Sequence, residues 1–151
     1  MVRISKLTDY GVIIMTFLAT RPKSKVFQAR EIAQHTSIAL PTVSKLLKTL
    51  VKNELLASER GVHGGYHLKV EPESISIVDL IQILEGPLAI TECNLTHTTC
   101  QSAAFCGIRA PWQHINRVIT QALDSIKLSD LVNTSHFTSL PLSSLPALGA
   151  H

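Results

Sequence analysis

The fold of this chain is decided by residues 28–70, which read QAREIAQHTSIALPTVSKLLKTLVKNELLASERGVHGGYHLKV. Residues 28–35 have the apolar spacing of a short helix, with Ile32 and Ala33 facing inward. A turn at residues 36–38 leads to a second helix that carries Pro41 in its first turn, although Ala39 or Leu40 would be a poor N-cap. The second helix buries one apolar face, made of Val43, Leu46, Leu47 and Leu50.

A β-hairpin is predicted next. Two extended runs, Leu55–Arg60 and Tyr66–Val70, flank the glycine-rich residues 61–65. Before the quoted stretch, apolar residues repeat at helical spacing until Arg21-Pro22 ends the helix; they are Leu7, Tyr10, Gly11, Ile14, Phe17 and Leu18. Helix, helix-turn-helix and hairpin follow one another in the winged-helix order. We therefore predict a mostly α fold with a small β-hairpin wing.

The exposed face of the second helix of this motif has the chemistry of a DNA-reading surface. It carries Thr42, Ser44, Lys45, Lys48, Thr49 and Lys52. The lysines would bind phosphates, and the short hydroxyl side chains permit close approach to base edges in the major groove. In the hairpin, Arg60 and His63 could reach a minor groove or flanking phosphates. The alternatives are an ordinary amphipathic surface helix and a plain glycine turn.

The charge distribution agrees with a DNA-binding head. Residues 1–70 hold eleven Lys and Arg against four Asp and Glu, whereas residues 71–151 hold three against seven. The hydrophobic fraction of 45% is high for a monomer and indicates apolar surface that a partner chain covers. The run Val12–Ala19 is too short to span a bilayer, and no cleavable leader precedes it, so we expect a cytoplasmic protein without a membrane segment.

The second half of the chain divides into a helix, a cysteine loop and another helix. Ser76 and Asp79 form a capping box for a helix that Gly86-Pro87 ends, and the loop occupies about residues 88–109. Pro111 opens a long helix with apolar positions at Trp112, Ile115, Val118, Ile119, Ala122, Leu123 and Ile126. We expect this helix to pack on a second copy. The predicted divisions are a DNA-binding domain at 1–72, a cluster-binding and dimerisation region at 73–133, and a disordered tail at 134–151.

All three cysteines, Cys93, Cys100 and Cys106, lie within fourteen residues in a C-x6-C-x5-C pattern. An odd number cannot close into intrachain disulfides, and the polar loop offers no core to bury three thiols. Thiolates are soft ligands for an iron–sulfur cluster or zinc, and their spacing alone does not separate the two. His97 lies inside the pattern and could complete a zinc site, and Glu92 lies beside it. No arrangement of catalytic residues is evident, so we do not expect an enzyme.

Several segments resemble the IscR/NsrR family of winged-helix transcriptional regulators. They are LTDYG at residues 7–11, RGVHGGY at 60–66 and LEG at 84–86, followed by the three spaced cysteines. ALPTVSKLLKTL at 39–50 and WQHIN at 112–116 resemble the branch that regulates iron–sulfur assembly of the SUF system. The resemblance covers about residues 1–133.

The resemblance implies a homodimer, joined through the long helix, that binds a palindromic operator on double-stranded DNA. It places DNA contacts on Thr42, Ser44 and Arg60, and it implies that a cluster on the three cysteines tunes DNA affinity.

The resemblance also suggests which residue supplies the fourth ligand of the cluster, beside the three cysteines. The IscR type has a histidine three residues after the last cysteine, where this chain has Arg109, so its 2Fe–2S site is in doubt here. The NsrR type takes a carboxylate from the first helix of the partner subunit, and Asp9 stands at that position. The motif match favours Asp9 as a ligand, and the alternative is an acidic residue that only favours the helix dipole.

The sequence therefore predicts a dimeric regulator with a 2Fe–2S or 4Fe–4S cluster, a repressor of SUF genes. One alternative is a DNA-binding factor with structural zinc. Another is an iron–sulfur carrier or redox subunit whose basic head is incidental.

Overall fold

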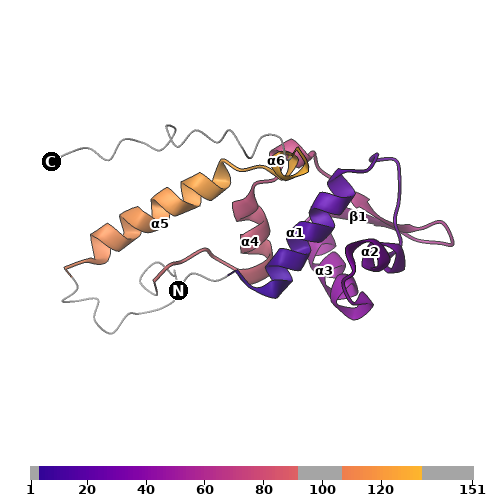
Figure 1. Cartoon of the computed structure of the whole chain (residues 1–151), viewed down its shortest axis with the longest axis horizontal. Helices are drawn as coiled ribbons and strands as arrows, with labels where there is room; N and C mark the ends of the chain where they lie inside the picture. Colours follow the sequence, from indigo (N-terminus) through magenta and orange to yellow (C-terminus); the bar gives the residue numbers. More distant parts are fainter. Residues whose placement is uncertain (1–3, 92–106, 134–151) are drawn as a thin grey trace.

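The computed structural model describes residues 4–91 and 107–133 of the chain. Figure 1 shows a globular body at one end and the long helix α5 reaching away from it at the other. The elements, in order, are α1 (Lys6–Ala19), α2 (Ala29–Thr36), α3 (Leu40–Lys52), β1 (Leu56–Glu59), β2 (Gly65–Leu68), the 3₁₀ turn η1 (Pro72–Ser74), α4 (Ile77–Glu85), α5 (Arg109–Asp124) and α6 (Leu128–Val132). The predicted mostly helical fold with one hairpin is confirmed.

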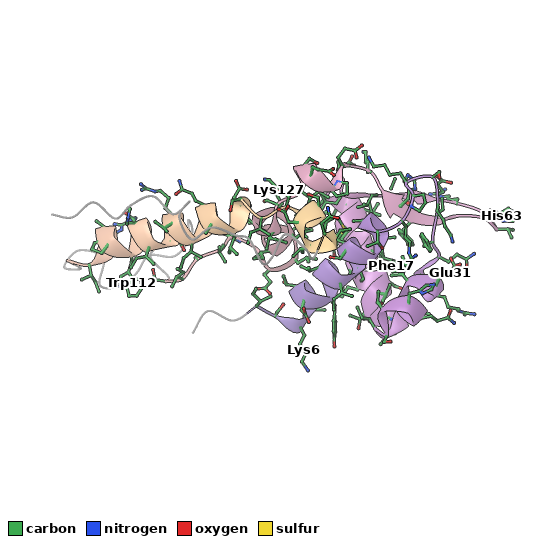
Figure 2. The ribbon with its side chains drawn as sticks, turned by 45° about the horizontal axis from the view of Figure 1, so that its top comes forward. Lys6, Phe17, Glu31, His63, Trp112 and Lys127 are labelled. Atoms are coloured by element: carbon green, nitrogen blue, oxygen red, sulfur yellow. The ribbon has the colours of Figure 1, made fainter. Side chains whose placement is uncertain are left out.

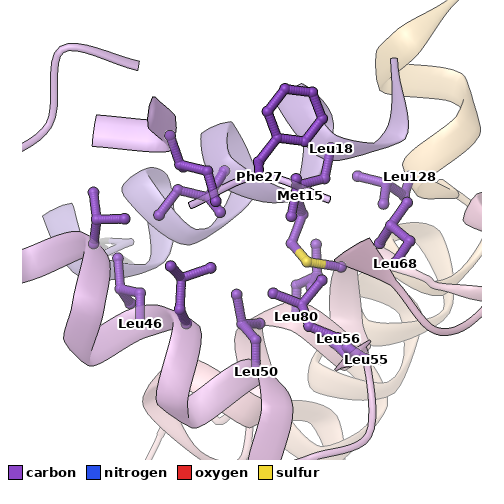
Figure 3. Packing of buried hydrophobic residues seen from close by; sticks show 14 of the residues in the cluster. Met15, Leu18, Phe27, Leu46, Leu50, Leu55, Leu56, Leu68, Leu80 and Leu128 are labelled. Carbon is purple, nitrogen blue, oxygen red and sulfur yellow. The ribbon is translucent and has the colours of Figure 1, made fainter. Parts of the chain in front are cut away.

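Helices α1, α2 and α3 pack around one apolar core. The predicted inward residues of α3 are buried, and Ile14 and Met15 of α1 and Ile32 of α2 are fully buried against them. Figure 3 shows Met15 between Leu18 and Phe27 above and Leu50, Leu56 and Leu80 below. The helical spacing read from the sequence thus corresponds to the core-facing sides of α2 and α3 and to most of that of α1, where Leu7 is exposed and Met15 is buried instead.

The turn between α2 and α3 lies at Ser37, as predicted. Ser37 adopts a left-handed conformation with φ of 56°, which ends α2 and redirects the chain. Ala39 is the N-cap of α3 and provides no side-chain hydrogen bond, and Pro41 lies in the first turn. The prediction that α3 has a poor N-cap is therefore confirmed. The position of α3 is set by the packing of its apolar inner face in the core.

The wing is a two-stranded antiparallel hairpin, shorter than predicted, in which Leu56 pairs with Leu68 and Glu59 with Gly65. Outside the hairpin, Phe27 forms a further antiparallel bridge with Tyr66, which the sequence did not indicate. The Tyr66 amide donates to the Phe27 carbonyl at 2.8 Å, and the Phe27 amide donates back at 3.0 Å. A Cβ at Gly65 would lie 2.4 Å from the Phe27 oxygen, so this close approach requires glycine.

Helices α4 and α6 complete the same core. The predicted capping box begins α4: Ser76 Oγ accepts from the Asp79 amide at 3.1 Å, and Asp79 Oδ2 accepts from the Ser76 amide at 2.9 Å. Leu80 of α4 and Leu128 of α6 are both fully buried in the cluster formed with the first three helices. The division predicted at residue 72 stays a prediction, with apolar packing that continues across it.

Helix α5 corrects the predicted extent of the long helix. It begins at Arg109, two residues before Pro111, and ends at Asp124, so Ile126 lies outside it. The chain at Ile126 is instead bound to the start of α4, where the Ile77 amide donates to the Ile126 carbonyl at 3.0 Å. That pairing turns the chain into α6, a helix the sequence reading missed.

The predicted apolar stripe of α5 is only partly covered by the described part of the chain. No residue of α5 is buried there, and Ile115 is 41% exposed. Trp112, the only tryptophan, lies in the outer half of α5, far from the core (Figure 2).

Candidate nucleic-acid interface and metal-binding segment

The outer face of α3 presents cations next to short hydroxyl side chains. Lys45 and Lys48 are exposed, and Thr42 and Ser44 are half-buried. The sequence of α3 contains no acidic residue, so nothing on the helix itself neutralises the lysines. Thr49, also predicted on this face, donates its hydroxyl to the Lys45 carbonyl at 3.2 Å within the helix. The structure therefore brings the predicted phosphate-binding and base-reading side chains to one face.

Two acidic residues of the head are paired with lysines outside α3. Glu54 forms an ion pair with Lys69 and Glu71 with Lys23, both at the surface. In the described part of the chain, neither Lys45 nor Lys48 takes part in an ion pair. Their charge is available to a phosphate backbone.

The wing holds Arg60 and His63 at its exposed tip, where Figure 2 shows His63 at the end of the molecule opposite α5. The tip is closed by a hydrogen bond from the Gly64 amide to the Gly61 carbonyl at 3.0 Å. A Cβ at Gly64 would lie 2.2 Å from the backbone oxygen of Glu59, so only glycine fits there. The glycine-rich tip of the predicted hairpin is thus a tight turn.

A contact that sequence reasoning missed ties the wing to the helix-turn-helix. Gln28, the N-cap of α2, donates from its side-chain amide to the Val62 carbonyl at 3.3 Å. Together with the Phe27–Tyr66 pairing, it attaches the wing to the start of α2 at two points. The contacts join residues more than thirty positions apart, and no local pattern in the sequence indicates them.

The candidate metal ligands fall mostly outside the described residues. Cys93, Cys100, Cys106, His97 and Glu92 all belong to residues 92–106. Among residues 4–91 and 107–133, there is no group of three or more metal-ligating side chains. The described residues do fix where both ends of this segment attach, because Thr91 follows a stretch bound to α5 and Gly107 leads into α5.

Asp9 is exposed in the first turn of α1. Its carboxylate has no hydrogen-bond or ion-pair partner in the part of the chain that the structure describes. The start of α1 is itself fastened to the end of α4, where the Ser5 amide donates to Glu85 Oε1 at 2.6 Å. Hydrogen bonds from the Ser5 and Thr8 side chains hold the pKa of Glu85 below its usual value. Asp9 thus lies on a helix anchored beside the point where the chain leaves α4 for the cysteines.

Arg109 is the first residue of α5 and is exposed. A guanidinium carries no free lone pair for a metal, so this position does not supply a ligand. Residues 4–91 and 107–133 contain no helix long and apolar enough to cross a membrane.

A helix-turn-helix with a cationic reading face, followed by a wing with basic residues at its tip, defines a winged-helix DNA-binding regulator. Comparison with known proteins identifies the family. A sequence model of the Rrf2 family, described as an iron-dependent transcriptional regulator, matches residues 4–134. The chain belongs to the Rrf2 family.

Individual relatives are regulators, not enzymes. The chain is 30% identical to the regulator CymR of Bacillus subtilis over 131 residues, covering 87% of this chain and 90% of CymR. It is 28% identical to the regulator IscR of Klebsiella pneumoniae over 131 residues, covering 87% and 80%. It is also 28% identical to the regulator NsrR of Shouchella clausii over 131 residues, covering 86% and 88%.

Solved structures confirm the winged-helix fold. The structure of CymR, described as the global cysteine regulator of B. subtilis, superposes with a TM-score of 0.71 at 32% identity, covering 89% of this chain and 98% of CymR. IscR of T. potens superposes with a TM-score of 0.69 at 28% identity, covering 92% of each chain.

Proposed function

We propose that this chain is an iron–sulfur-dependent transcriptional repressor that controls genes of iron–sulfur cluster assembly of the SUF type. The observation that carries the proposal is the concentration of all three cysteines between residues 93 and 106 in a chain of the Rrf2 family. Three thiolates form a soft donor set suited to iron–sulfur chemistry. Cys93, Cys100 and Cys106 would hold the cluster, which would supply a centre that tunes DNA affinity in response to oxygen, nitric oxide, iron supply or cluster demand.

The fourth ligand in this proposal is Asp9, donated by the first helix of a second copy. Its carboxylate has no partner among residues 4–91 and 107–133, and a hard oxygen donor on iron–sulfur chemistry is readily exchanged. Because α1 packs directly in the head, gain or loss of this ligand would shift the balance between two orientations of the head. His97 is the alternative ligand, and zinc on the same cysteines is the alternative metal.

For DNA, we propose that Thr42 and Ser44 read base edges and that Lys45 and Lys48 bind phosphates. Arg60 and His63 would contact a minor groove or flanking phosphates beside each half-site. The apolar stripe of α5, which the described residues cover only in part, supports a homodimer, which would place two heads on a palindromic operator. Ile119→Asp, which puts a charge into that stripe, should therefore yield a monomer by light scattering and lose operator affinity.

The experiment that tests the cluster is anaerobic purification followed by iron, sulfide and zinc analysis and a visible spectrum. We expect a brown protein, loss of the cluster in each single cysteine-to-alanine variant, and an altered spectrum in Asp9→Ala. Asp124→Ala, which removes an exposed carboxylate at the end of α5, is the matched control and should retain the wild-type spectrum. A colourless protein with about one zinc per chain would replace the cluster with a structural zinc site.

The similarity to CymR favours a second candidate, a regulator that responds to cysteine supply without a cluster. It predicts wild-type DNA binding after all three cysteines are replaced. The cluster proposal predicts instead that the triple variant no longer distinguishes anaerobic from oxidised conditions in a gel-shift assay.

A further inference from the structure

The side chain of Asn116 holds the main chain that leads into residues 92–106. The Ile90 amide donates to Asn116 Oδ1 at 3.0 Å, and Asn116 Nδ2 donates to the Leu88 carbonyl at 3.3 Å. One amide side chain thus satisfies an N–H and a C=O two residues apart, as a neighbouring β-strand would. Asn116 is half-buried and lies midway along α5.

Few other contacts determine the direction of α5. Among the described residues, α4 is the helix that it packs against, and no residue of α5 is fully buried. Two backbone hydrogen bonds just after α5 attach its C-terminal end to the head. The Ile77 amide donates to the Ile126 carbonyl at 3.0 Å, and the Leu128 amide donates to the Ile75 carbonyl at 2.8 Å. Asn116 adds a second fixed point eight residues away from Asp124, roughly 12 Å along the axis. Figure 1 shows the chain after α4 running beneath α5 where this contact lies.

We propose that Asn116 is a positioning residue that sets the direction of α5 and thereby the separation of the two DNA-binding heads. This inference rests on the proposed dimer through α5. The helix has sixteen residues and is therefore about 24 Å long. A rotation of about 10° at its base moves the far end by about 4 Å, close to the 3.4 Å step of one base pair. A modest change of direction would therefore alter which half-site spacing the dimer accepts.

The residue type supports a role beyond helix formation. Asparagine in a helix interior is less favourable than alanine, because its side chain competes for backbone groups. Here both polar atoms of its amide bind another segment of the chain. A role limited to stability would lower the melting temperature and leave the preferred spacing unchanged, which provides the distinguishing measurement.

The test compares wild type, Asn116→Ala and Asn116→Asp on duplexes that carry two half-sites with the spacer varied by single base pairs. The half-site is selected from a randomised pool by the wild-type protein. Gln121→Ala is the matched control, because Gln121 is an exposed amide on the same helix with no side-chain hydrogen bond in the described part of the chain. Aspartate keeps the acceptor for Ile90 and loses the donor to Leu88.

Wild type and Gln121→Ala should prefer one spacing by about tenfold over its neighbours, a preference set by the fixed separation of the heads. Asn116→Ala should remain dimeric by light scattering and keep its affinity for a single half-site, while the spacing preference falls to about threefold or less. Asn116→Asp should lie between them. A wild-type spacing preference in Asn116→Ala would overturn the inference, and so would a monomeric Asn116→Ala protein. A monomeric wild type would instead overturn the proposed dimer.

Discussion

Truncation of Leu128 tests whether α6 belongs to the core of the DNA-binding head. Leu128 is fully buried although it lies nearly sixty residues beyond the wing, and its amide donates to the Ile75 carbonyl at 2.8 Å. Leu128→Ala removes three buried carbon atoms, worth about 2.4 kcal/mol of transfer free energy at roughly 0.8 kcal/mol each. A residual cavity among Leu80 and its neighbours adds to this. The free energy of unfolding should fall by about 3 to 4 kcal/mol.

The assay is urea unfolding of the full chain followed by far-UV circular dichroism at one fixed protein concentration, since association would shift the midpoint. The melting temperature should fall by about 10 °C or more. Leu131→Ala, a half-buried position on the same helix, is the control and should cost about 1 kcal/mol. A loss below about 1 kcal/mol for Leu128→Ala would refute the reasoning, because α6 would then not be packed in the core.

Three further perturbations address the interface and the α1–α4 junction. Gly64→Ala places a Cβ against the Glu59 carbonyl and should distort the wing, lowering operator affinity about tenfold in a gel shift while the far-UV spectrum is kept. Lys45→Ala should weaken binding to all sequences and reduce the slope of log affinity against log salt by about 1. Glu85→Gln should lower the melting temperature at pH 7. Because the pKa of Glu85 is lowered in the folded protein, its hydrogen bonds with Ser5 stabilise the fold fully at pH values above its unfolded-state pKa of about 4.3. This stabilisation is lost as the pH falls through the lower pKa that Glu85 has in the folded state.

For each of these three substitutions, a control or a contrary outcome tests the reasoning. Gly107→Ala, which adds a Cβ in open space, controls for Gly64→Ala and should bind DNA like wild type. An unchanged salt slope in Lys45→Ala would remove that lysine from the phosphate contacts. A stability difference between Glu85→Gln and wild type that persists unchanged below pH 3 would exclude the ionised carboxylate as its cause.

The parts of the fold predicted from sequence are those set by local patterns. The inner face of α3 and the capping box at Ser76 both follow from residues close together in the chain, and both are confirmed. The five-residue helix α6 is too short to show a period, and it is stabilised by the core that Leu128 enters. The end of α5 was misplaced for a related reason, because pairing of Ile126 with the start of α4 is a long-range contact.

The candidate site likewise has features that local sequence patterns predict and features that depend on long-range contacts. The cationic face of α3 was predictable because it is the complement of the buried face. The contacts of Gln28 with the wing and of Asn116 with residues 88–90 were not, because each joins a side chain to backbone far along the chain. The three cysteines were identified from ligand chemistry alone, and they lie outside the described residues, so their geometry stays a prediction.

The position of the single tryptophan gives the protein a selective optical reporter. Trp112 lies on α5, away from the apolar core that holds the head together. Its indole is half-buried, so its emission responds to whatever covers or uncovers that helix. Excitation at the red edge of the indole band would leave both tyrosines silent. Fluorescence would then follow events along α5, while circular dichroism of the same sample follows all the helices, most of which lie in the head, and the two can be timed against each other.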